Sequence, residues 1–198
     1  MASTAVNSLA EPINQLLAVV EKRVRAALAL GRAERSREVD AILSRIKDET
    51  KNILGYLLKE LNRQALADPR FADAARRQRL LDSDIKTDMF NRFGFDPSGL
   101  NTVEANAGLC PSLIGGVAAG IGAGAVAATL SGGAAPVTVT AIAIAVAAIV
   151  FFIIKRHYDT QNGGAGESVD AYMANLKKTI YEWLDAVEKE YWERVEKI

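Results

Sequence analysis

One stretch decides the fold of this chain: Val137-Thr-Val-Thr-Ala-Ile-Ala-Ile-Ala-Val-Ala-Ala-Ile-Val-Phe-Phe-Ile-Ile154. Its 18 residues carry no charge, and they end an uncharged region of 50 residues between Glu104 and Lys155. An α-helix of this length would be roughly 27 Å long at about 1.5 Å per residue, close to the ~30 Å hydrocarbon core of a bilayer. Such side chains have to be hidden from water, either in lipid or inside the protein. The sequence therefore predicts contact with a membrane.

An apolar segment of equal length, Leu113–Leu130, precedes this stretch. We call it the first arm and Val137–Ile154 the second arm. The turn-forming segment Ser131-Gly-Gly-Ala-Ala-Pro136 lies between them and predicts a hairpin. Residues 137–146 alternate with period two, which is typical of a strand. A transmembrane strand would need polar residues on its other face, where this stretch has mostly alanine, so we predict two helices.

Small residues repeat every four positions along the first arm. They are Gly116, Gly120, Gly124 and Ala128. Residues four apart share a helix face, so this row would form a groove in which another helix can approach closely. The groove can join several hairpins into an oligomer, or it can seat the second arm of the same molecule. Both interpretations stay open at the level of sequence.

The larger apolar side chains of the two arms are the expected membrane-inserting residues: Leu113, Ile114, Val117, Ile121, Ile142, Ile149, Phe151, Phe152, Ile153 and Ile154. Lys155 and Arg156 follow the second arm directly, and basic residues beside a span tend to stay on the cytoplasmic side. Trp183 and Trp192 are further candidate interface anchors. The alternative for both tryptophans is ordinary packing between helices.

Amphipathic helices are predicted on both sides of the hairpin, because apolar residues recur there at helical spacing. The predicted helices run from Glu11 to before Gly31, over Ser36–Leu66, Phe71–Leu81 and Asp84–Phe93 with Ser83 as N-cap, and over Ser168–Ile198. The expected fold is all-α, with amphipathic helices flanking a central hydrophobic transmembrane helical hairpin. Its regions are an amphipathic part (1–104), the hairpin (105–156), a flexible linker (157–167) and a C-terminal helix (168–198).

Composition argues against several other classes of protein. The 24 basic and 24 acidic residues cancel, whereas nucleic-acid binders usually show a basic excess. Cys110 is the only cysteine and His157 the only histidine, which leaves no disulfide framework, thiolate cluster or catalytic triad. We therefore expect no enzyme, no metal and no cofactor. The N-terminus has neither a basic nor an apolar leader region, so we expect synthesis in the cytoplasm without a signal peptide. We expect the protein to act at or in a membrane, and the membrane of a target cell is one candidate.

The Gly/Ala-rich run Ser112-Leu-Ile-Gly-Gly-Val-Ala-Ala-Gly-Ile-Gly-Ala-Gly-Ala-Val-Ala-Ala-Thr-Leu130, its Gly/Pro turn and the second arm resemble the hydrophobic hairpin of pore-forming colicins. The resemblance covers about residues 111–156. It implies a helical bundle that buries the hairpin in water, inserts it into a bilayer and opens an ion-conducting pore. It also implies a neutralising, immunity-type partner. This chain departs from the family in its long helix after the hairpin.

Three functions follow from these observations. The first is a membrane-inserting, pore-forming α-helical protein that acts on a lipid bilayer, as a homo-oligomer. The second is a constitutive two-span membrane protein whose helices form a cytoplasmic scaffold or interaction domain. The third is a bundle that stays in water with an unusually apolar core hairpin.

Overall fold

A computed structural model of the chain describes residues 4–96, 137–159 and 169–198. Those ranges contain helices and no strand, which confirms the all-α prediction. The helices are α1 (Thr4–Asn7), α2 (Ala10–Leu28), α3 (Arg32–Ala67), the 3-10 helix η1 (Pro69–Phe71), α4 (Ala74–Asp82), α5 (Ile85–Phe93), α9 (Val137–Asp159) and α10 (Val169–Val195).

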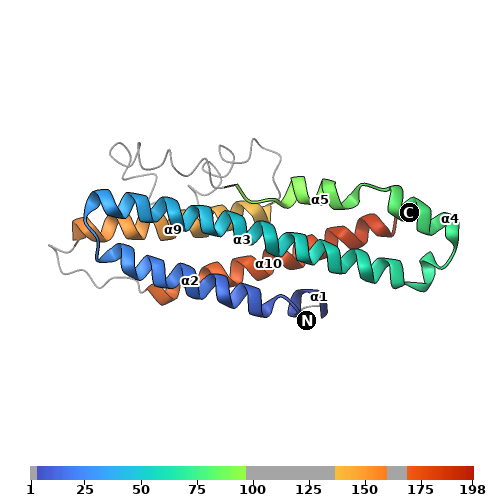
Figure 1. Ribbon diagram of the computed structural model, residues 1–198, viewed down its shortest axis with the longest axis horizontal. Helices are drawn as coiled ribbons and strands as arrows, with labels where there is room; N and C mark the ends of the chain where they lie inside the picture. The colour runs from blue at the N-terminus through green and yellow to red at the C-terminus, as the bar shows by residue number, and fades with distance from the viewer. Residues whose placement is uncertain (1–3, 97–136, 160–168) are drawn as a thin grey trace.

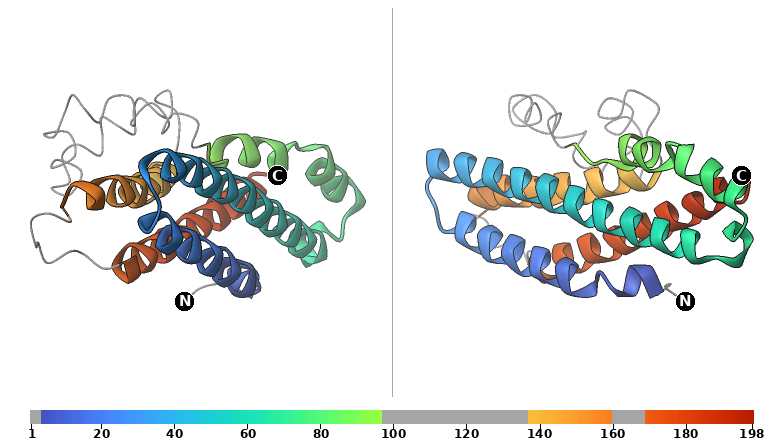
Figure 2. Two further views of the ribbon diagram at one scale, coloured as in Figure 1. Left: turned by 60° about the vertical axis from the view of Figure 1, so that its left-hand side comes forward. Right: turned by 45° about the vertical axis from the view of Figure 1, so that its right-hand side comes forward.

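The helices form an elongated bundle around two long members, α3 and α10 (Figure 1). A short turn joins α2 to α3, and both of these helices contact α10. Helix α9 lies along the half of the bundle near that turn, against α10, α2 and α3. Helix α5 covers the other half, against α3 and α10, as the further views in Figure 2 also show. Helices α9 and α5 thus pack against different halves of the long helix pair α3 and α10.

The apolar stripes predicted for the long amphipathic helices form the core. The buried side chains of α2 are Ile13, Leu16, Leu17, Val20, Val24 and Ala27. Those of α3 include Val39, Ile42, Leu43, Ile46, Ile53, Leu54, Leu57, Leu61 and Ala65. Leu58, directly after Leu57, is also fully buried. The reason is that α3 packs against both α5 and α10, which widens its buried face beyond the single stripe of a surface helix.

Helix ends follow local chemistry, but several predicted ends were wrong. Helix α3 begins at Arg32 rather than Ser36, and the helix predicted from Phe71 begins at Ala74, with Asp73 as its N-cap. Helix α3 ends at Ala67, directly before Asp68-Pro69 as predicted, and the Asp68 side chain accepts a hydrogen bond from the Arg70 amide at 2.8 Å. The prediction of Ser83 as N-cap of the next helix was wrong. The Ser83 hydroxyl instead donates to the Leu80 carbonyl at 2.6 Å, and Asp84 precedes the first residue of α5. Ser83 therefore caps the last turn of α4 rather than the first turn of α5.

The turn between α2 and α3 is closed by a buried arginine. Arg35 is 8 % exposed, and its guanidinium donates to the Ala27 carbonyl at 3.2 Å and the Leu30 carbonyl at 2.6 Å. Carbonyls at a helix C-terminus have no partner within the helix and carry partial negative charge. The arginine supplies both the donors and the compensating charge, so it fixes α3 against the end of α2.

Helix α9 confirms the helical assignment of the second arm, because Val137–Asp159 is helical rather than extended. It also continues past Ile154, so residues 157–159 of the predicted linker are helical. Lys155 and Arg156 favour helix, and the first glycine after the second arm comes only at Gly163. The first arm, with its row of Gly116, Gly120, Gly124 and Ala128, lies outside the described residues, as do Leu113, Ile114, Val117 and Ile121.

Two glycines near Phe90, Gly55 on α3 and Gly94 directly after α5, predict opposite effects of an added methyl group. A Cβ on Gly55 would lie 3.9 Å from the Phe90 ring, an ordinary contact, so Gly55→Ala should stabilise the protein by about 0.5–1 kcal/mol through helix propensity. A Cβ on Gly94 would lie 2.8 Å from the Phe90 carbonyl oxygen, so Gly94→Ala should destabilise it by about 1–3 kcal/mol. Urea unfolding measures both changes. Shifts of the same sign would contradict this packing.

Candidate functional site: the buried apolar helix

The apolar helix α9 is covered on one face by the amphipathic helices around it. Among its described side chains, the buried ones are all apolar: Val139, Ile142, Ala143, Ala145, Val146, Ile149, Val150, Phe152 and Ile153. Helix α10 makes its most extensive contact, and α2 and α3 contact it as well. The apolar faces of three amphipathic helices thus cover a stretch that would otherwise meet water. Removing that surface from water is the dominant favourable term for this arrangement.

Of the predicted membrane-inserting residues, four have described side chains, and all four are in the core. Ile142 and Ile153 are fully buried, Ile149 is 1 % exposed and Phe152 is 8 % exposed. The Phe152 ring meets Tyr172 of α10, with centroids 4.8 Å apart and planes at 37°. This aromatic contact joins the later part of α9 to the first turns of α10. The side chains of Phe151, Ile154, Lys155 and Arg156 lie outside the described ones, although their backbone belongs to α9.

The other face of α9 is less covered. Ala141, Ile144 and Ala148 follow one another at helical spacing, and each is partly exposed. The helix is therefore fully enclosed on one side and accessible in part on the other.

The two tryptophans of α10 occupy different environments. Trp183 is fully buried, and its Nε1–H donates to the Phe93 carbonyl at 3.2 Å. Trp192 is partly buried and meets Tyr191 edge to face, with centroids 5.8 Å apart. In the bundle Trp183 contacts α5, and Trp192 packs at the edge of the hydrophobic core. Their predicted role as interface anchors concerns a membrane-bound form and stays a prediction.

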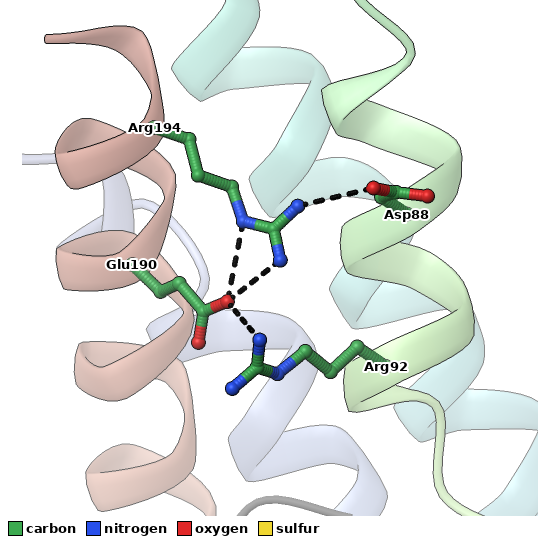
Figure 3. A network of polar contacts seen from close by, with 4 residues as sticks. All are labelled: Asp88, Arg92, Glu190 and Arg194. Atoms are coloured by element: carbon green, nitrogen blue, oxygen red, sulfur yellow. Dashed lines mark hydrogen bonds and ion pairs between the residues drawn. The ribbon is translucent and has the colours of Figure 1, made fainter. Parts of the chain in front are cut away.

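A polar network clasps α5 to α10 at the surface (Figure 3). We call Asp88, Arg92, Glu190 and Arg194 the α5–α10 clasp. Arg194 donates to Glu190 Oε1 at 2.8 Å and to Asp88 Oδ2 at 3.2 Å, and Arg92 binds the same Glu190 oxygen at 2.9 Å. The spacing of Glu190 and Arg194 predicts a pair within one helix, but the partners across helices had no signal in the sequence.

The enclosing helices are also joined to one another at the surface. Arg25 of α2 binds Asp170 of α10 at 2.6 Å, and Arg23 of α2 binds Glu38 of α3 at 2.8 Å. The Arg25 and Asp170 side chains are 51 % and 72 % exposed, so water and salt screen the pair and it contributes little stability. Such contacts orient the helices around α9 without holding them strongly.

Tyr191 makes a contact of another kind, inside the bundle. Its hydroxyl donates to Asn62 Oδ1 of α3 at 3.3 Å, and burial raises the pKa of Tyr191 to about 12. The phenol therefore stays neutral at any physiological pH. Folded protein prefers this protonated form, so the contribution of Tyr191 to stability is complete below about pH 10 and is lost as the pH rises toward 12.

The described residues offer little for other kinds of site. They contain no group of three or more histidine, cysteine, aspartate or glutamate side chains that could hold a metal ion. In the described residues, no helix is both long enough and apolar enough to cross a membrane. The α9 side chains at 137, 151 and 154–159 are not among those described. Comparison with protein-family models, curated proteins and solved structures gave no match.

Proposed function

We propose that this protein inserts into a lipid bilayer and permeabilises it, and that the helical bundle is the form in which it carries its apolar arms through water. The observation that carries the proposal is the position of α9. The second arm has 18 uncharged residues in sequence, and the apolar faces of α2, α3 and α10 cover it. A chain that enclosed such a helix only for stability could use an ordinary amphipathic one.

The physical basis is an exchange of one apolar surrounding for another. Lipid tails are as apolar as leucine side chains, so an apolar helix loses little when it moves from the bundle into a bilayer. The amphipathic helices that covered it can then lie in the bilayer interface, with their apolar faces toward the lipid. The cost lies in separating the helices, and the exposed Arg25–Asp170 pair between α2 and α10 opposes that separation weakly.

In the inserted form we propose that both arms cross the bilayer as a transmembrane helical hairpin. Lys155 and Arg156 would then stay on the side where the amphipathic helices remain. The small-residue row of the first arm would bring hairpins together in a homo-oligomer, because close backbone approach gains van der Waals contact in lipid. A neutralising partner would act by binding the bundle or the inserted hairpin.

The test is leakage from dye-loaded vesicles after purified protein is added from water. We expect release from vesicles of equimolar phosphatidylglycerol and phosphatidylcholine, together with a stepwise ion conductance in planar bilayers of the same lipids. Protein that binds no vesicle and releases no dye under any pH or lipid composition would overturn the proposal in favour of a bundle that stays in water. Protein that can be recovered only in detergent would instead favour a constitutive two-span membrane protein.

A further inference from the structure

A groove with a mixed apolar and basic lining runs between α3 and α5. It is open, has a volume of about 320 Å³, and is lined chiefly by Lys51, Gly55, Tyr56, Lys59, Lys86 and Phe90. Positions 51, 55 and 59 are four apart and share one face of α3, while positions 86 and 90 share one face of α5. Two rows, each with lysine and apolar positions, therefore face each other across the groove.

The groove has a local excess of positive charge in a protein whose net charge is zero. None of the described residues that line it is acidic. Of the neighbouring carboxylates on α3, Glu49 pairs with Arg45 and Glu60 pairs with Arg63, each within 2.8 Å. Across the described part of the chain, no carboxylate forms an ion pair with Lys51, Lys59 or Lys86. Three lysines and no acidic residue therefore line the groove, and this positive charge favours an anionic occupant.

The apolar part of the groove is aromatic and unusually accessible to solvent. Tyr56 is 61 % exposed, and Phe90 forms the opposite wall with Lys51 Nζ 5.9 Å from its ring centroid. Gly55 has no side chain to fill the space in front of that ring. The other large apolar side chain that is exposed in the described residues is Leu81, on the helix directly before α5. Lysine with an exposed tyrosine is typical of surfaces that meet the headgroup region of a bilayer.

We propose that this groove docks the phosphate headgroup of an anionic phospholipid, so that the α3–α5 face of the bundle is the first to meet the membrane. The inference rests on the proposed function, because it names the lipid and the surface through which the bundle would reach a bilayer. Lys51, Lys59 and Lys86 would surround the phosphate, and the Tyr56 and Phe90 rings would contact the glycerol and the upper acyl chains. A lipid fits this lining better than a free anion, which would leave the aromatic walls unused.

Vesicle flotation with a triple variant tests the inference. Lys51→Gln, Lys59→Gln and Lys86→Gln together should weaken binding to equimolar phosphatidylglycerol and phosphatidylcholine by about 100-fold, since each lysine near an anionic surface contributes roughly a fivefold gain. The control replaces Lys177, Lys178 and Lys189 of α10 with glutamine. It changes the charge equally but touches no residue of the groove, and we expect a loss of less than about tenfold, from the general field of the protein alone. Circular dichroism confirms that both variants are folded.

Two further binding measurements identify the source of the anion. Wild-type protein should bind phosphatidylcholine vesicles weakly, and raising the salt from about 0.1 M to about 1 M should release it from anionic vesicles as the Debye length falls from about 10 Å to about 3 Å. Glycerol phosphate in solution should compete only weakly. Tight binding of glycerol phosphate, or of a polyglutamate peptide in the absence of vesicle binding, would overturn the lipid assignment.

The outcomes also separate this inference from the proposed function. Equal vesicle binding by the groove variant and the α10 control would overturn the inference, whether or not the wild-type protein releases dye. Binding that depends on the three lysines, without any leakage from the wild-type protein, would support the groove and overturn the pore. Saturating protein should restore leakage in the groove variant, because its α9 is unchanged.

Discussion

Ile144→Lys is expected to lower the leakage rate by about 100-fold or more while the bundle in water remains folded. Ile144 lies near the middle of the second arm, where lysine costs about 2.5–3.5 kcal/mol in a membrane-spanning helix. In the bundle the same residue is partly exposed, so a lysine there can extend its ammonium group into water. Dye release from anionic vesicles measures the first effect, and urea unfolding followed by circular dichroism measures the second.

The matched control is Ile144→Met, which has a similar length and no charge. It should leak at close to the wild-type rate, because methionine is accepted in both lipid and protein. Binding to vesicles without leakage is the expected behaviour of Ile144→Lys, since the α3–α5 groove is unchanged. Leakage by Ile144→Lys at the wild-type rate would show that α9 does not enter the hydrocarbon, and the proposed function would then lose its main support.

The helices and their buried faces could be predicted from sequence because each depends on local spacing. An amphipathic helix shows its buried side in the period of its apolar residues, and the stripes of α2, α3 and α10 lie in the core. The secondary structure of the second arm was harder to predict, since its first ten residues also fit a strand. A transmembrane strand would need polar residues on its second face, which here is mostly alanine, and this decided for a helix.

The contacts that join distant segments could not be predicted in this way. Trp183 meets the carbonyl of Phe93 across 90 positions of the chain, and the pairing of Asp88 with Arg194 spans 106. Both depend on how α5 lies against α10, which no local pattern specifies. The groove lysines illustrate the same limit, because Lys86 joins Lys51 and Lys59 only when α5 packs on α3. For Trp183 the sequence left both a membrane-interface role and packing between helices open, and in the bundle its side chain packs in the core.

The environment of Trp183 leads to the largest expected change in stability. Trp183→Ala should reduce the free energy of unfolding by about 3–5 kcal/mol, the usual cost of deleting a large buried aromatic side chain. Trp183 is fully buried, and its Nε1–H is the hydrogen-bond donor to the carbonyl at the end of α5. Since a small domain is stable by about 5–15 kcal/mol, the loss is a large fraction of the total. Urea unfolding monitored by circular dichroism measures it.

Two controls separate the parts of this effect. Trp183→Phe keeps most of the buried ring but leaves the Phe93 carbonyl without its donor, so it should cost about 1–3 kcal/mol. Trp192→Ala removes a partly buried ring and should cost less than Trp183→Ala. An equal cost for the two alanine variants would contradict the core position of Trp183.

A bundle weakened at Trp183 also separates its helices more readily, so Trp183→Ala should release dye faster than the wild-type protein, the reverse of Ile144→Lys. A change in the same direction for both variants would mean that opening of the bundle does not limit insertion.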